Sequence, residues 1–246
     1  MKSIVWQMNK LKPLEKFVLE YLLTNSHTNS IGYYYLPLEY QKKDLNLGRN
    51  NIGEAIKGLM EKGLIVYDFS TEVVAIGNYK NYYGFDVNSM QIDVFDTMPI
   101  SWAFRKCFHW LSGCLFGEIA RNVVRHDKVR KSLAMETDST SSDELYYAGF
   151  DMFWAVYPNK KGIDNAVDNF MELVKRNGVD PEDIIAAAIN YEDDYKNKPM
   201  PRIICIERAD KFLDPETKFF SKYIVKKNFY LNEEQEKQNV DEDCPF

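Results

Sequence analysis

Apolar residues near the start of the chain recur with a helical period. The positions i, i+3, i+4, i+7 and i+8 are held by Leu14, Phe17, Val18, Tyr21 and Leu22. With a proline at the first position, this spacing predicts a helix from about residue 13 to residue 24. The polar cluster TNSHTNS then predicts a turn, and the aromatic run IGYYYL predicts a short strand.

A second amphipathic pattern lies in LGRNNIGEAIKGLMEKGLI at residues 47–65, after the short helix expected in LPLEYQKKDLNL. It predicts a helix over residues 49–62 that ends at Gly63, a residue suited to the left-handed conformation. The buried face would hold Ile52, Ala55, Ile56, Leu59 and Met60, and the opposite face Asn50, Asn51, Gly53, Glu54 and Lys57. LIVYDFSTEVVAIGNY then predicts two strands joined by the polar turn DFSTE.

The predicted order is helix, strand, helix, helix, strand, turn, strand, which is that of a winged helix. In such a fold three helices bury their apolar faces together and the β-hairpin covers their flank. We therefore predict a mainly α protein with a small β-hairpin wing, built as an N-terminal winged helix-turn-helix plus a C-terminal α-helical domain.

The polar face of the 49–62 helix has the chemistry for reading DNA. A helix fits the major groove, where Asn can bond adenine, Glu can accept from cytosine, and cations can hold phosphates. The candidate DNA contacts are Arg49, Asn50, Asn51, Glu54 and Lys57, with the wing near residues 69–72. The alternative is that the winged helix mediates protein contacts or dimerises, because this face carries only one Lys and one Arg.

Charge and composition suggest five segments. Residues 1–135 carry 17 Lys and Arg against 13 Asp and Glu, a net charge of +4, whereas residues 136–246 have a net charge of −10. Contact with nucleic acid would therefore belong to the first half. The expected segments are a winged-helix DNA-binding domain (1–84), a helical extension (85–134), a polar linker (135–144), a helical partner-binding domain (145–230) and an acidic disordered tail (231–246).

A basic stripe is predicted within the helical extension, in GEIARNVVRHDKVRKSL. On one continuous helix, Arg121, Arg125 and Lys128 share a face, and Arg130 and Lys131 continue the charge. The stripe is a second candidate DNA contact. It could instead dock on the acidic second half of the chain or form a solvated helix face.

The first block resembles the N-terminal winged-helix domain of phage replisome organisers, the replication initiation proteins of phages and prophages in low-GC Gram-positive bacteria. The resemblance covers about residues 10–84 and is carried by YLLTNSHTNSIGYYYLPLEY, KDLNLGRNNIGEAIKGLMEKGLIVYD and VVAIGNYKNYY. It implies binding to origin DNA and a C-terminal part that engages the machinery that loads the helicase.

The third block, FDMFWAVYPNKKGIDNAVDNF, is similar to a looser motif at the C-terminal end of phage replication proteins and helicase-loader partners. The positions that match are Phe150, Phe153, Trp154, Tyr157, Pro158, Lys160, Ala166 and Phe170. The resemblance implies partner contacts at Phe153, Trp154, Tyr157, Lys160 and Lys161. The departure is Asp164, near the place where members usually carry a further Lys; the aromatic residues are equally explained as core.

No catalytic or metal-binding pattern emerges. There is no phosphate-binding loop, the three His residues at 27, 109 and 126 form no ligand pair, and Cys107 and Cys114 flank His109 at no standard zinc spacing. We expect no enzyme activity, no cofactor and no metal. Without a secretory leader or an apolar run of membrane-spanning length, we expect a cytoplasmic protein with no membrane contact.

Together these patterns predict a non-enzymatic replication initiator. It would bind DNA at a replication origin, form homo-oligomers there, and recruit the replicative helicase or its loader. The alternatives are a winged-helix transcription regulator with a C-terminal sensor or dimerisation domain, and an adaptor that binds only proteins. The role of residues 85–134 stays open at this stage.

Overall fold

A computed structural model describes residues 4–79, 82, 94–115, 117–137, 140–197 and 206–224. The chain divides into two compact units, Met1–Val156 and Tyr157–Phe246. The described residues are mainly helical, with a small three-stranded antiparallel sheet. This confirms the predicted class of a mainly α protein with a small β-hairpin.

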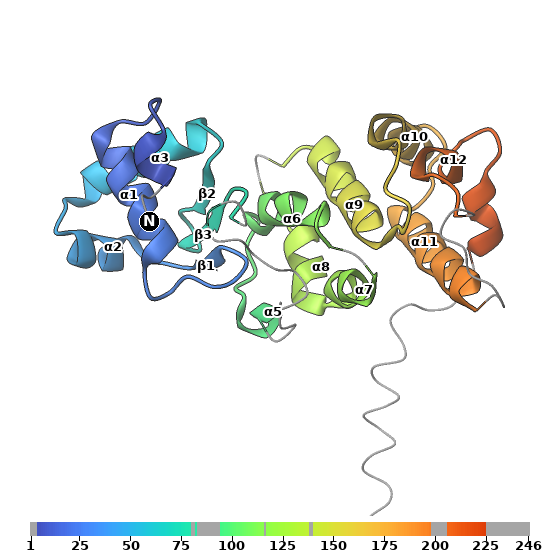
Figure 1. Ribbon diagram of the computed structural model, residues 1–246, viewed down its shortest axis with the longest axis horizontal. Coiled ribbons are helices and arrows are strands. Elements are labelled where there is room, and N and C mark those ends of the chain that lie inside the picture. Colours follow the sequence, from blue (N-terminus) through green and yellow to red (C-terminus); the bar gives the residue numbers. More distant parts are fainter. Residues whose placement is uncertain are drawn as a thin grey trace, which may run out of the picture. The chain divides into compact units, whose positions relative to one another are not determined.

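The first unit begins with the predicted order of helices and strands. The elements are the 3-10 helix η1 (Ile4–Gln7), α1 (Pro13–Thr24), β1 (Tyr33–Tyr35), α2 (Leu38–Leu45), α3 (Arg49–Glu61), β2 (Ile65–Asp68) and β3 (Val73–Ile76). Helix α3 packs against α1, α2 and β2 (Figure 1). Helix α3 is therefore the element on which α1, α2 and β2 all pack.

Helix α3 buries the face that its sequence pattern predicts. Ile52, Ala55, Ile56 and Leu59 are buried, and Met60 is partly buried against the same core. The helix ends before Gly63, whose φ of 66° is the left-handed conformation expected there. Because one face of α3 packs into the core, the opposite face is exposed to solvent.

Helix α1 buries some but not all of its regularly spaced apolar residues. Val18, Leu19, Leu22 and Leu23 are its buried apolar residues, whereas Phe17 is 43% exposed. The apolar residues of α1 cover more than one stripe, so periodicity alone leaves two possible faces. Leu19 and Leu23, which lie outside the regularly spaced series, belong to the core cluster that includes the buried residues of α3.

The sheet has the strand order β1-β3-β2, so β3 is central. Its residues alternate between two faces, and all four are buried. Val74 and Ile76 belong to the core shared with α1 and α3. On the other face, Tyr33 pairs with Ala75 and packs edge-on against Phe104, with ring centroids 5.0 Å apart.

The described helices that follow complete the first unit. They are α5 (Val94–Thr97), α6 (Phe104–Ser112), α7 (Gly117–Arg125), α8 (Asp127–Ala134) and α9 (Ser142–Val156). Helix α6 contacts β3, and α9 packs on α6, α7 and α8 (Figure 1). The helical extension is therefore part of the same compact unit as the sheet.

The segment expected to be a linker, residues 135–144, contains the start of α9. The hydroxyl of Ser141 accepts a hydrogen bond from the backbone N–H of Glu144 at 3.2 Å, which is helix N-capping chemistry. Arg105 of α6 also donates to the hydroxyl of Thr140 at 3.2 Å. The polar residues thus begin a helix, and the division between the units falls after Val156 rather than in this segment.

The regular elements described in the second unit are all helices. It contains α10 (Ile163–Lys175), α11 (Pro181–Lys196), α12 (Ala209–Phe212) and the 3-10 helix η4 (Phe219–Tyr223). Asp180 caps α11 by accepting from the N–H of Glu182 at 2.9 Å, directly before Pro181. The tail predicted for residues 231–246 lies outside the described residues.

Candidate nucleic-acid interface on α3 and the β2–β3 turn

The outward face of α3 carries the side chains that the sequence predicts as candidate DNA contacts. Arg49, Asn50, Asn51, Glu54 and Lys57 are all exposed. They are exposed because the residues between them fill the core shared with α1 and the sheet. All five predicted contacts are thus brought onto one surface.

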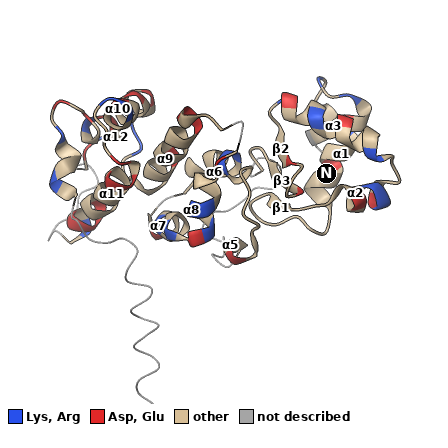
Figure 2. Cartoon of the chain, turned by 180° about the vertical axis from the view of Figure 1, so that it is seen from behind, with Lys and Arg blue, Asp and Glu red and all other residues tan. Residues whose placement is uncertain are grey.

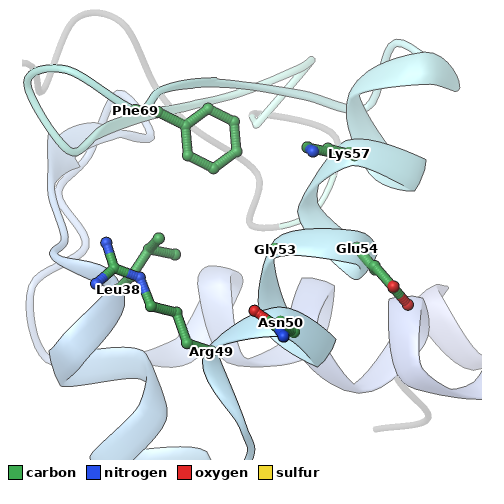
Figure 3. A pocket seen from close by; sticks show the side chains of 7 residues that line it. All are labelled: Leu38, Arg49, Asn50, Gly53, Glu54, Lys57 and Phe69. Carbon is green, nitrogen blue, oxygen red and sulfur yellow. The ribbon is translucent and has the colours of Figure 1, made fainter.

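A hollow of about 560 Å³ opens beside this face. Its lining comes from the start of α2, the outward face of α3 and the β2–β3 turn, and consists of Leu38, Arg49, Asn50, Gly53, Glu54, Lys57 and Phe69. In Figure 3 the Phe69 ring and Lys57 lie on opposite sides of the opening, and Glu54 points away from it. Asn51 does not line the hollow.

The cations at this hollow are few. Arg49 makes an exposed ion pair with Glu39 of α2, with nitrogen and oxygen 3.6 Å apart, and exposed pairs of this kind contribute little. Lys57 has no ion-pair partner among the residues that the structure describes. Figure 2 shows both signs of charge on α3, so the surface is mixed rather than strongly basic.

The β2–β3 turn is held rigid by the carboxylate of Asp68, which is 2% exposed. Its oxygens accept from the backbone N–H of Ser70 at 3.0 Å and from the hydroxyls of Ser70 and Thr71 at 2.6 and 2.7 Å. Ser101 donates a further bond at 2.7 Å from the segment before α6. Burial raises the pKa of Asp68, but these hydrogen bonds together outweigh it and lower the pKa to about 2.

The same turn presents an aromatic ring to solvent. Phe69 is 44% exposed, and its ring packs edge-on against Tyr67 with centroids 4.9 Å apart. Tyr67 is fully buried and donates to the carbonyl oxygen of Leu36 at 2.8 Å. The sequence pattern predicted this turn only as a wing, although an apolar Phe within the polar run DFSTE is a signal for an exposed aromatic side chain.

The basic stripe differs from its prediction as one continuous helix face. Helix α7 ends at Arg125 and α8 begins at Asp127, with His126 between them in an extended conformation. Arg121 and Arg125 therefore belong to one helix, and Lys128, Arg130 and Lys131 to the next. The i, i+4, i+7 spacing does not hold across the break.

Three of the stripe cations are engaged within the chain. Lys131 pairs with Asp127 at 2.6 Å, and Arg130 pairs with the same carboxylate at 3.7 Å and also donates to the carbonyl oxygen of Arg125. Lys128 donates to the carbonyl oxygen of Asp96. Hydrogen bonding to Lys131 is the main cause of the lowered pKa of Asp127. The α8 cations thus serve to join α5, α7 and α8.

The aromatic residues expected to bind a partner are interior residues. Phe153, Trp154 and Tyr157 are all buried, which is a correction to their assignment as contact residues. Tyr157 packs against Phe212 with ring centroids 4.9 Å apart and donates to the carbonyl oxygen of Glu207 at 3.0 Å. Of the five predicted partner residues, Lys161 is exposed and Lys160 half-buried.

A histidine and a buried carboxylate join α6 to α9. Nδ1 of His109 lies 3.0 Å from both oxygens of Asp151, which is 6% exposed. Hydrogen bonding to Asp151 raises the pKa of His109, and burial raises the pKa of Asp151. The hydroxyl of Ser112 lies within donating distance of the backbone oxygen of His109, at 2.9 Å, and of Oδ1 of Asp151, at 3.4 Å. We interpret the group as a structural link between helices.

The described residues contain no group of three or more His, Cys, Asp or Glu side chains placed to hold a metal ion. Cys107 and Cys114 are not joined in a disulfide, and Cys107 is buried. Among the described helices, none combines the length and the apolar character needed to cross a membrane.

Comparison of the chain with models of known protein families, with curated proteins and with solved structures finds no match. The function is therefore argued from the surface that α3 and the β2–β3 turn form.

Proposed function

We propose that residues 13–76 form a winged helix-turn-helix that binds DNA, and that the protein is a phage or prophage replication initiator of the replisome organiser kind. The order of the elements and the strand order β1-β3-β2 support the winged helix. The observation that carries the proposal is the outward face of α3, where every predicted contact residue is exposed. Its amides can bond base edges, and Arg49 and Lys57 can hold phosphates.

Initiation rather than simple DNA binding is supported by the resemblance of residues 10–84 to replisome organisers. A face with two cations makes few phosphate contacts, so one copy would bind weakly. Several copies on adjacent origin sites would bind much more tightly through multivalency. We therefore propose a homo-oligomer on origin DNA, which acts in the cytoplasm without catalysis, cofactor or metal.

In this proposal the second unit recruits the replicative helicase or its loader. Because Phe153, Trp154 and Tyr157 are buried, the contact would use surface side chains instead. Lys161 is exposed, and so are the carboxylates of Glu182 and Asp183 at the start of α11. Co-purification of the full chain with the replicative helicase or loader encoded alongside it tests this part. Absence of a complex with either would contradict recruitment.

DNA binding is tested by fluorescence anisotropy of the full chain with labelled origin and random duplexes at several salt concentrations. We expect the logarithm of the affinity to fall with that of the salt concentration, with a slope of about −0.9 for each phosphate contacted. Arg49→Ala and Lys57→Ala should each weaken binding several-fold and reduce that slope by about one. Lys211→Ala, at an exposed position in the second unit, is the matched control.

The alternatives give different results in the same titration. A protein-only adaptor would bind neither duplex at any salt concentration. A transcription regulator would bind a promoter operator tightly and show no preference for origin DNA. Unchanged affinity in both the Arg49 and Lys57 variants would show that α3 is not part of the DNA interface.

A further inference from the structure

The composition of the β2–β3 turn is unusual for a wing that contacts only the phosphate backbone of a duplex. Its residues, DFSTE, include no Lys or Arg. The carboxylate of Asp68 is turned inward, and that of Glu72 accepts from the backbone N–H of Leu38 at 3.3 Å. Phosphate contacts are made largely by cations and other donors, so this turn contributes little to them. What it presents instead is the exposed ring of Phe69.

The ring is held in place before any ligand arrives. The turn on either side of it is tied by five groups that donate to Asp68, namely the N–H and hydroxyl of Ser70, the N–H and hydroxyl of Thr71, and the hydroxyl of Ser101. Behind the ring stands Tyr67, itself buried and hydrogen-bonded. A rigid aromatic side chain loses little conformational freedom on binding, which favours its use as a stacking surface.

The wall of the hollow opposite Phe69 is formed by α3, which carries polar side chains there and leaves space at Gly53. Gly53 lies on α3 facing this space, and a Cβ atom built on it would meet nothing within 4 Å. Asn50 lies one helical turn before Gly53, and Lys57 one turn after it, across from the Phe69 ring (Figure 3). The hollow of about 560 Å³ falls within the range of roughly 300–1,000 Å³ typical of small-molecule sites.

We infer that this hollow binds one unpaired nucleotide of single-stranded DNA, with its base stacked on Phe69 and its phosphates held by Arg49 and Lys57. Asn50 then lies within the hollow to bond the edge of the base. Bases in a duplex are covered on both faces by their neighbours, whereas an unpaired base offers a free face to an aromatic ring. The inference rests on the proposed function and extends it from duplex binding to capture of a strand that has been opened.

The test compares a labelled mixed-sequence 20-nucleotide single strand with the same sequence as a blunt duplex, using the full chain. Phe69→Ala should weaken binding to the single strand by about five-fold to a hundred-fold, the range that base stacking on an aromatic residue spans. Binding to the duplex should change by less than two-fold. Phe69→Tyr, which keeps the ring, should restore binding to the single strand.

Two further variants separate stacking from folding. Tyr147→Ala removes an aromatic residue of similar exposure, 50%, from α9 and should leave both affinities unchanged. Gly53→Leu should place a side chain in the open space beside α3 and so weaken single-strand binding. Circular dichroism of this variant should show that the fold is intact. Equal losses for both DNA forms with Phe69→Ala, or no loss for either, would overturn the inference.

The outcome also distinguishes this inference from the proposed function. Duplex binding that depends on Arg49 and Lys57, without single-strand binding by the wild-type chain, overturns the inference and leaves the proposed function standing. If the wild-type chain binds neither form, both fail.

Discussion

The first unit has exposed basic residues on the outward face of α3 and in the α7–α8 stripe, and the two sets differ in what their side chains contact. The α3 surface has only Arg49 and Lys57, but both extend outward and Lys57 has no ion-pair partner among the described residues. The α7–α8 stripe has more cations, yet its α8 members contact Asp127 and backbone oxygens of the same unit. The comparison shows that a run of basic residues in the sequence need not lack partners in the fold, since Lys128, Arg130 and Lys131 all contact oxygen atoms of their own unit.

The largest effect expected concerns the turn beside the α3 surface. Asp68→Asn should lower the free energy of unfolding at pH 7 by about 2 kcal/mol, because the carboxylate loses charge-assisted hydrogen bonds. The pKa of Asp68 is about 2 in the folded protein and about 3.9 in an unfolded chain, so its stabilising effect is present above about pH 4. It is lost as the pH falls through 2.

Urea denaturation of wild type and variant between pH 7 and pH 2 measures this difference. The two curves of stability against pH should converge at the acidic end. A constant difference over that range would mean that the Asp68 charge does not hold the turn.

The next effect concerns the packing that holds α3 in place. A Cβ atom at Gly58 would clash with Oε1 of Glu15, whose carboxylate is buried and bound by Lys62 and by the N–H of Lys12. Gly58→Ala should therefore lower the free energy of unfolding by about 1–2 kcal/mol despite the better helix propensity of Ala.

Gly53→Ala on the same helix is the matched control, because an added methyl group there meets nothing. It should raise stability by up to about 1 kcal/mol, as Ala is the better helix former. Thermal unfolding of the two variants gives both values. Equal shifts of the same sign would show that α1 and α3 do not approach closely at Gly58.

Removing two cations from each surface in turn tests the comparison directly. The double variant Arg49→Ala with Lys57→Ala should weaken duplex binding about ten-fold or more, because two phosphate contacts are lost. The double variant Lys128→Ala with Lys131→Ala should change the affinity by less than two-fold, since both side chains have internal contacts. The reverse ranking would make the stripe the DNA surface.

The smallest effect expected lies in the helical group, away from α3. Hydrogen bonding to Asp151 raises the pKa of His109, so the link stabilises the protein below the unfolded pKa of about 6.5 and weakens as the pH rises through the folded value. His109→Gln should therefore lower the melting temperature more at pH 5.5 than at pH 9. DNA affinity at a fixed pH should not change; a change would connect α6 to the interface.

Much of the fold follows from local patterns. The helices at 13–24 and 49–61, the turn at Gly63 and the Asp180-Pro181 helix start are set by periodicity, backbone freedom and capping, which a sequence displays directly. The five exposed residues of α3 follow for the same reason, since a buried stripe implies an outward one.

The rest depends on contacts between distant residues. Nothing near Phe153 or Trp154 in the sequence says whether an aromatic residue meets a partner or the chain's own interior. The helix break at His126 and the contact of Lys128 with the carbonyl oxygen of Asp96, 32 residues away, depend on how α7 and α8 pack on their neighbours. The hollow beside α3 likewise needs Leu38 and Phe69, which lie 31 residues apart, to be brought together by the sheet.

The central strand β3 is covered on both faces, by α1 and α3 on one and by α6 on the other. A shortened protein ending near residue 84 would leave Tyr33, Val73 and Ala75 uncovered, an apolar strip prone to self-association. Residues 1–84 are therefore expected to associate when they are produced without the helices that follow. A chimera that borrows them should extend at least through α6, the helix that contacts β3.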